Sequence, residues 1–404
     1  MLMSLRANIY TALIVPAVLI VLLLVWHNDS YDPKTLLSLG NHPSGGVPNV
    51  HLFFPVDKRS AESEDGSVVF CKTIQGAVVN GWTPILFNWE VESEHQMRKV
   101  QGLRDLLDSP VHTAGFEEDD LILMMDAFDV FIQLSPEVAA RRFTEYGDVD
   151  VMAAAEKNCY PNDPNGHICQ DAPWSPLHNG PNANLYRPND DPNRPYDQEE
   201  TLPRHVNSGT VIGKLSKMRT FYNELWDFML SDTYEGWDDQ GAFGIFLTDQ
   251  PVKTRLSVDY HSRLFWPGFQ DFQNIRFMGT HYPPDPSTAA SYSDPEASDY
   301  IPWDLYPMLA HHRKTGEVPV ALHFNGPIKE LINEWWGQLW WSSQRDRFLP
   351  IIHQRMSQGK VLIAIPEGYR EMPVQELCPH MDIWQWQSSH QTTDGRGSSV
   401  AQDE

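Results

Sequence analysis

Hydrophobic and polar positions along the chain form two recurring patterns, short apolar runs and longer segments with a helical period. The apolar runs predict buried strands at residues 50–56, 83–89, 121–125, 149–155, 205–213 and 320–324. A period of three to four residues predicts helices at 60–80, 94–107, 136–146, 216–230 and 238–247. Because the strands alternate with helices, we expect an α/β fold with a mostly parallel sheet and helices on both faces.

Three segments depart from this pattern. Residues 157–204 are rich in Pro, Asn and Asp, and a loop of this length is uncommon in a compact domain unless it is functional. A second loop-rich stretch is expected at roughly 266–318. A tryptophan-rich helix is expected after the last strand. On one helix, Trp336 and Trp340 would share a face and would either pack in the core or stack on the flat face of a ligand.

The N-terminal segment differs in composition from the rest of the chain. Residues 9–26 carry no charge and predict one transmembrane helix, and Arg6 before them favours a cytoplasmic N-terminus. A cleaved signal peptide is the alternative, although no A-x-A-like site follows Trp26. The predicted parts are a cytoplasmic stub (1–8), a signal anchor (9–26), a stem (27–47), a lumenal domain (48–387) and a disordered tail (388–404). This organisation predicts a type II protein of the Golgi or endoplasmic reticulum membrane.

Charge and cysteine content narrow the possible ligands and the compartment. The 404 residues include 30 Lys and Arg but 54 Asp and Glu, so the net charge of −24 argues against nucleic-acid binding. A phosphorylated ligand would need local neutralisation, for which a divalent cation is the usual means. An oxidising lumen favours disulfides. Cys159 and Cys169 would close a small ring, whereas Cys71 and Cys378 are either a second pair or buried thiols.

Two carboxylates, Asp126 and Asp129, follow the predicted strand 121–125. In open α/β sheets ligands bind beyond the carboxyl ends of the strands, and two carboxylates in one turn can hold Mn²⁺ or Mg²⁺. Their alternative role is that of ordinary turn and cap residues. After the strand 320–324, His323 could be a third ligand and Lys329 could neutralise a diphosphate, or this segment could be a simple tight turn.

Two further motifs have a functional and a purely structural interpretation. Asp238 and Asp239 begin a predicted helix, where acidic residues favour the helix dipole. One of these carboxylates could instead face a sugar and stabilise positive charge. Asn207 and Ser208, in the segment HVNSGT, could line a sugar pocket or form a turn.

Taken in order, the motifs DAFDVF, AAE, VNSG, DDQ and HFNGPIK resemble a known family. They are similar to the glycosyltransferase domain of the procollagen lysyl hydroxylase/collagen glucosyltransferase group and its single-pass membrane relatives. The resemblance covers about residues 48–345 and implies a GT-A-like (Rossmann-like) fold, a UDP-sugar donor, Mn²⁺ and retention of configuration. The glycine-rich stretch before the second helix of that family is replaced here by EHQMRK.

The resemblance implies a role for each matching residue. The metal ligands would be Asp126, Asp129 and His323. The diphosphate would lie at Asn325, Gly326 and Lys329. The donor sugar would lie near Asn207, Ser208 and Gly209. The catalytic acidic pair, between donor sugar and acceptor, would be Asp238 and Asp239. The residues expected near the nucleotide are Val56, Asp57, Lys99 and Trp89. Glu156, in the AAE motif, would end a strand at the same rim.

The leading hypothesis is a lumenal hexosyltransferase that moves glucose or galactose from a UDP-sugar to a glycan or protein acceptor, with Mn²⁺ or Mg²⁺ as cofactor. A metal-dependent phosphoesterase would use the same carboxylates and histidine to hydrolyse phosphate esters. A lectin-like or scaffold domain would keep the fold without turnover. The sequence leaves the identity of the acceptor open.

Overall fold

The computed structural model describes residues 48–91, 97–176, 202–236, 238–251, 253–279 and 307–384. The chain divides into two units, Met1–Pro43 and Ser44–Glu404, and the description below concerns the second. The predicted transmembrane helix (9–26), the stem and the tail lie outside the described residues. Among the helices that are described, none has the length and apolar character of a membrane span.

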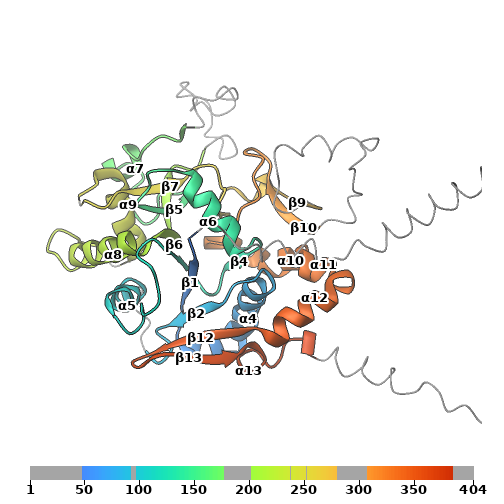
Figure 1. The fold of residues 1–404 in the computed structure, drawn as a ribbon. Helices are drawn as coiled ribbons and strands as arrows, with labels where there is room; N and C mark the ends of the chain where they lie inside the picture. The colour runs from blue at the N-terminus through green and yellow to red at the C-terminus, as the bar shows by residue number, and fades with distance from the viewer. Residues whose placement is uncertain are drawn as a thin grey trace, which may run out of the picture. The chain divides into compact units, whose positions relative to one another are not determined.

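The domain is built on an eight-stranded sheet with the order β13-β12-β2-β1-β3-β6-β5-β7 (Figure 1). Its strands are β1 (Val50–Pro55), β2 (Pro84–Phe87), β3 (Leu121–Met125), β5 (Val151–Glu156), β6 (His205–Lys214), β7 (Leu256–Asp259), β12 (Lys360–Ile365) and β13 (Gly368–Pro373). Within this sheet, β6 and β13 run antiparallel to their neighbours and the other pairs are parallel. The predicted α/β class and mostly parallel sheet are therefore confirmed.

Helices cover both faces of the sheet. On one face, α5 (Met97–Asp108), α8 (Leu215–Met229) and α9 (Asp239–Asp249) pack their apolar residues on those of β1, β2, β3, β5 and β6 in one large core cluster. On the opposite face, α4 (Glu64–Val79) contacts β2, and α12 (Arg345–Gln358) packs on α4. This is the arrangement that right-handed crossovers produce when successive strands are added on either side of β1. The helix α6 (Pro136–Glu145) contacts β1.

The predicted helix at 60–80 is in fact two helices, α3 (Lys58–Glu62) and α4. Ser63 between them has an extended backbone (ψ 154°), and its hydroxyl accepts a hydrogen bond from Gly66 N at 3.1 Å. The chain is interrupted there because a serine in this position caps the next helix better than it continues the previous one.

The predicted long loops contain regular structure. Residues 157–176 include a short helix, α7 (His167–Gln170), and the disulfide Cys159–Cys169. The stretch 266–318 was predicted to be loop-rich, but it contributes the end of β8 (Phe265–Pro267), the 3-10 helix η3 (Phe272–Asn274) and the antiparallel pair β9 (Ile275–Gly279) and β10 (Met308–His312). Apart from β8, whose three residues are buried, these elements are too polar or too short to give a clear apolar period.

A second small sheet brings distant segments to the functional edge. Its strands are β4 (Val130–Ile132), β11 (Ala321–His323) and β8, in the order β4-β11-β8. The strand β11 is antiparallel to β4, with His323 opposite Val130, and parallel to β8. Residues on either side of these strands therefore meet at one place, although they are almost two hundred positions apart in the sequence.

Three of the four tryptophans after β11, Trp335, Trp340 and Trp341, are buried in the core. The four lie on two short helices, α10 (Ile332–Trp336) and α11 (Trp340–Ser343), so Trp336 and Trp340 do not share one helix as predicted. Trp335 stacks on Trp266 with ring centroids 5.4 Å apart, and Trp340 is almost fully buried. The packing interpretation therefore holds for Trp335, Trp340 and Trp341, whereas Trp336 is only partly buried.

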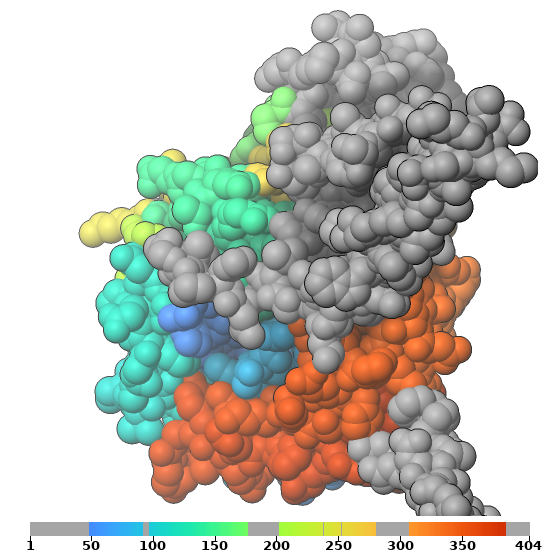
Figure 2. All heavy atoms as spheres, turned by 45° about the vertical axis from the view of Figure 1, so that its right-hand side comes forward, coloured from blue at the N-terminus to red at the C-terminus, as the bar shows by residue number. Residues whose placement is uncertain are grey.

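The C-terminal part of the domain completes the sheet. The strand β12 pairs with β2, and β13 forms the sheet edge beyond it. The following helix α13 (Val374–Leu377) is tied to α4 by the disulfide Cys71–Cys378. In Figure 2 these orange-to-red residues lie beside the blue residues from the start of the described chain. The open alternative for Cys71 and Cys378 is thus resolved in favour of a pair.

Candidate metal centre and its cavity

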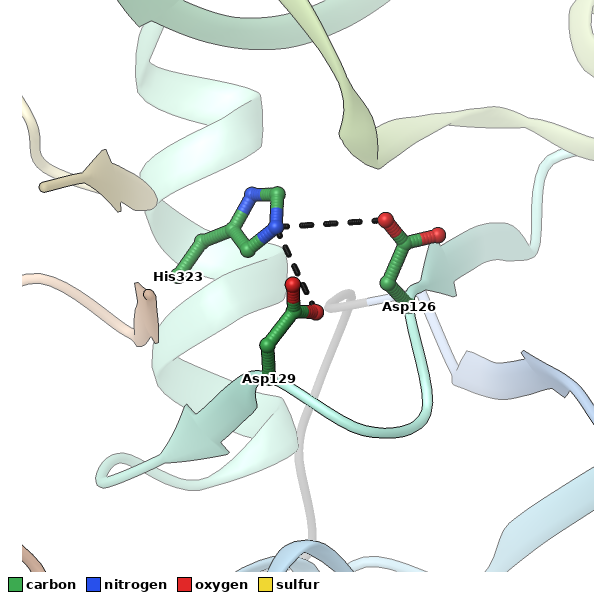
Figure 3. A group of neighbouring side chains, drawn as sticks. All are labelled: Asp126, Asp129 and His323. Atoms are coloured by element: carbon green, nitrogen blue, oxygen red, sulfur yellow. Dashed lines mark ion pairs between the residues drawn. The ribbon is translucent and has the colours of Figure 1, made fainter. Parts of the chain in front are cut away.

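Two aspartates and one histidine form a compact group at the ends of three strands. Asp126 directly follows β3, Asp129 directly precedes β4, and His323 is the last residue of β11. One ligand atom from each lies within 4.8 Å of the others. The imidazole Nε2 of His323 is 3.4 Å from Asp129 Oδ1 and 3.9 Å from Asp126 Oδ2 (Figure 3). The group offers carboxylate oxygens and one imidazole nitrogen, a donor set suited to Mn²⁺.

A neighbouring asparagine prepares the histidine for this role. The ring Nδ1 of His323 is 2.9 Å from Asn207 Oδ1, which also accepts a hydrogen bond from Gly209 N at 3.0 Å. Since a carboxamide oxygen only accepts, Nδ1 of His323 donates here, and Nε2 is the ring atom that faces the two carboxylates and is placed to bind an ion. Metal-bound histidines are oriented in the same way by partners behind them.

The strand β6 makes room for the group by a bulge and a glycine. Its pairing with β5 shifts in register next to Ala153 and Ala154. Gly209 lies in this irregular stretch, and a Cβ there would be 2.2 Å from His323 Cε1 and 2.7 Å from Asp126 Oδ2. Bulges beside functional sites re-aim side chains in this manner. Only a residue without a side chain allows Asp126 and His323 to come this close to the strand.

Two lysines balance the carboxylates. Lys99, which is partly buried, places its Nζ 2.7 Å from Asp239 Oδ2 and 3.2 Å from Asp126 Oδ1. Burial alone would lower the pKa of Lys99, but the attraction of Asp126 and Asp239 outweighs it and raises the pKa. Lys329 Nζ lies 2.9 Å from Asp129 Oδ2. Burial opposes ionisation of Asp129, yet His323 and Lys329 hold its pKa far below the usual range, so it is ionised at neutral pH.

The acidic pair at the start of α9 has two different environments. Asp238 caps the helix, with Oδ1 accepting from Gly241 N at 2.7 Å. Its Oδ2 is buried and has no hydrogen-bond partner among the described residues. Asp239 is instead paired with Lys99. An oxygen atom of Asp238 is therefore left for a ligand, whereas Asp239 serves first to hold the lysine.

Glu156 has a more central position than its place at the end of β5 indicated. It is buried, and it accepts hydrogen bonds from the side-chain amides of Asn207 (3.2 Å), Gln240 (2.8 Å) and Asn325 (2.5 Å). Burial raises the pKa of Glu156 to about 8, although the three amides act in the opposite direction. The carboxyl group thus fixes three side chains from three distant segments around one cavity.

All these residues surround a cavity of about 800 Å³, large enough for a nucleotide-sugar. The residues expected in the site that line it are Val56, Asp57, Lys99, Asp126, Asp129, Glu156, Asn207, Ser208, Asp238, Asp239, His323, Asn325, Gly326 and Lys329. Gly209 supports the metal ligands from behind, and Trp89 is buried in the core. Lining residues that the sequence analysis missed include Ser60, Asn88, Arg98, Tyr160, Gln240 and Phe269.

Comparison with known proteins leaves the family open. No protein-family model and no curated protein matches the chain. Among solved structures, a glycosyltransferase involved in the glycosylation of the major capsid of PBCV-1 is similar at 10% sequence identity, with a TM-score of 0.37. The match covers 71% of this chain and 98% of the viral one. Because similarity at this level supports no conclusion about function, the proposal below is based on the residues of the site.

Proposed function

We propose that the chain is a metal-dependent glycosyltransferase of GT-A-like fold that moves a hexose, glucose or galactose, from a UDP-sugar to an acceptor hydroxyl. The observation that carries the proposal is the Asp126–Asp129–His323 group in one cavity with two lysines and an Asp238 oxygen that has no hydrogen-bond partner in the described part of the chain. A diphosphate requires cationic neighbours, and a departing sugar requires a nearby carboxylate. A scaffold or lectin-like domain would need neither arrangement.

In this proposal the chain's own residues divide the chemistry between the two ends of the cavity. Asp126, Asp129 and His323 would hold the ion, which supplies Lewis-acid stabilisation of the diphosphate leaving group when bound. Lys329, half exposed beside Asp129, adds positive charge where the leaving group develops its negative charge. Asp238 presents its free oxygen to the sugar and stabilises positive charge at the anomeric carbon.

The transfer then follows with retention. The bond between the anomeric carbon and the diphosphate oxygen breaks, and the acceptor oxygen bonds to the same face of that carbon. The departing diphosphate takes up the acceptor's proton, so no side chain has to serve as a covalent nucleophile. We further propose that the domain is lumenal and membrane-anchored; the disulfides Cys71–Cys378 and Cys159–Cys169 support an oxidising compartment.

The test is a donor assay on the purified chain with Mn²⁺. UDP should be released from UDP-glucose or UDP-galactose, and release should stop when the metal is chelated. Asp129→Asn should lose metal-dependent UDP binding while keeping its melting temperature, whereas Asp65→Asn, at an exposed position on α4, should behave like the wild type. Failure of the wild type to bind UDP or any UDP-sugar refutes the proposal. Hydrolysis of simple phosphate esters without sugar transfer would indicate a phosphoesterase instead.

A further inference from the structure

The cations that line the cavity differ in whether the protein already neutralises them. Among the described lining residues they are Arg98, Lys99 and Lys329. Lys99 is engaged by Asp126 and Asp239, and Lys329 is engaged by Asp129. Arg98 is exposed, and no carboxylate of the described residues lies within ion-pair distance of it. Within the described part of the chain, its positive charge is therefore left for a ligand.

The backbone around Arg98 is held in place by the end of β2. Asn88 has a left-handed backbone conformation (φ 64°), and its Nδ2 donates to the carbonyl oxygen of Arg98 at 3.0 Å. Gly102, one helical turn further, permits this contact, because a Cβ there would lie 2.2 Å from Asn88 Oδ1. The first turn of α5 is thus fixed against the edge of the sheet, where Asn88 and Arg98 both line the cavity.

The charge of the cavity explains why a free guanidinium matters. Its lining includes six carboxyl groups, those of Asp57, Asp126, Asp129, Glu156, Asp238 and Asp239. A diphosphate adds more negative charge, and the two lysines are already committed to protein carboxylates. A guanidinium has a planar set of donors that matches phosphate oxygens in a two-point contact. Arg98 is the cation of the described lining that can make such a contact without first breaking an ion pair.

We propose that Arg98 binds the diphosphate of the nucleotide-sugar and determines the preference for a nucleoside diphosphate over the bare nucleoside. This assignment rests on the proposed function, because it concerns the same cavity. It also gives a role to the arginine of the EHQMRK segment, which directly precedes Lys99. Lys99 pairs with the protein's own carboxylates, Asp126 and Asp239, and Arg98 binds the negatively charged phosphate oxygens of the ligand.

The experiment compares UDP with uridine. Calorimetric titrations at fixed Mn²⁺ would use the wild type, Arg98→Gln, Arg98→Lys and the control Arg59→Gln, which removes the same charge from an exposed position on α3 outside the cavity lining. Arg98→Gln should weaken UDP binding about 10- to 100-fold, as expected for a lost charge-assisted contact, and leave uridine binding unchanged. Arg98→Lys should lose less, and Arg59→Gln should lose nothing.

The outcomes separate this proposal from the function on which it rests. If the wild type does not bind UDP with Mn²⁺, the proposed function fails. If the wild type binds UDP and Arg98→Gln binds it equally well, the function stands and the assignment of Arg98 is overturned. Equal losses for UDP and uridine in Arg98→Gln would also overturn it, because the contact would then be to the base or ribose. An equal loss of UDP affinity in Arg59→Gln would attribute the effect to net charge alone.

Discussion

Substitution of Gly209 by alanine tests the candidate metal centre without replacing any of the proposed metal ligands. The new Cβ would start 2.2 Å from His323 Cε1, whereas ordinary van der Waals contact begins at 3.4 Å. The imidazole would therefore have to retreat by about 1.2 Å (3.4 − 2.2). Asp126 Oδ2, at 2.7 Å, would have to retreat by about 0.7 Å (3.4 − 2.7). Ligand distances in metal sites are held to within about 0.2 Å, so the group cannot keep its geometry.

The expected result is a loss of metal affinity in a folded protein. Displacing the supports of metal ligands commonly costs about 10- to 100-fold in affinity, and we expect at least this for Gly209→Ala. Overpacking at a buried position also costs about 1–3 kcal/mol of stability, so the domain should melt earlier but remain folded. Free Mn²⁺ measured by electron paramagnetic resonance gives the affinity, and circular dichroism gives the fold.

Gly213→Ala is the matched control. Gly213 lies on the same strand, and its Cβ would also be crowded, at 2.8 Å from Asp150 O and 3.1 Å from the Met218 side chain, but away from the metal ligands. This variant should lose stability and keep its Mn²⁺ affinity. Wild-type affinity in Gly209→Ala would refute the metal site as described. Equal losses in both variants would show that damage to β6, rather than displacement of His323, is responsible.

Two further predictions concern the buried carboxyl group of Glu156 and the two disulfides. Because burial raises the pKa of Glu156 from 4.5 to about 8, the folded protein retains a proton that the unfolded chain has lost in this range. The free energy of unfolding should therefore rise as the pH falls from 8 toward 5, by up to about 1.4 kcal/mol per pH unit. Urea denaturation should show this slope in the wild type and not in Glu156→Gln; an unchanged slope would contradict it. Removing the Cys71–Cys378 disulfide by double substitution with serine should lower the melting temperature more than removing Cys159–Cys169, because the sequence separations are 307 and 10 residues. Equal or reversed effects in scanning calorimetry would contradict the loop-length argument.

The sequence predicted those parts of the fold in which one segment determines its own structure. The strand 121–125 was predicted with its observed bounds, since its five consecutive residues are all apolar and buried, and polar residues flank the strand on both sides. The segment KVLIAI of β12 carries a similar apolar signal and could have been found in the same way. By contrast, β9 is mostly half-exposed and mixes polar with apolar residues, so no period reveals it.

The same distinction holds for the candidate site. Asp126 and Asp129 follow a buried strand, and their position at the carboxyl-end edge of the sheet could be inferred from that fact alone. The hydrogen bonds of Glu156 could not be predicted, because the three amide donors come from residues 207, 240 and 325, which only tertiary folding brings together. The role of Gly209 depends likewise on where the imidazole of His323 lies, which no local pattern contains.

The position of β12 has a consequence for how the protein is made. During synthesis β2 emerges early, but its partner on one side is β12, near the other end of the chain, with Leu362 beside Ile85. Until then β2 has an open, apolar edge of the kind that pairs with other chains. Larger proteins are most exposed to aggregation while such edges are unpaired. The pairing of β2 can therefore be completed only late in synthesis, after β12 has been made, and the Cys71–Cys378 bond links that late part of the chain to α4.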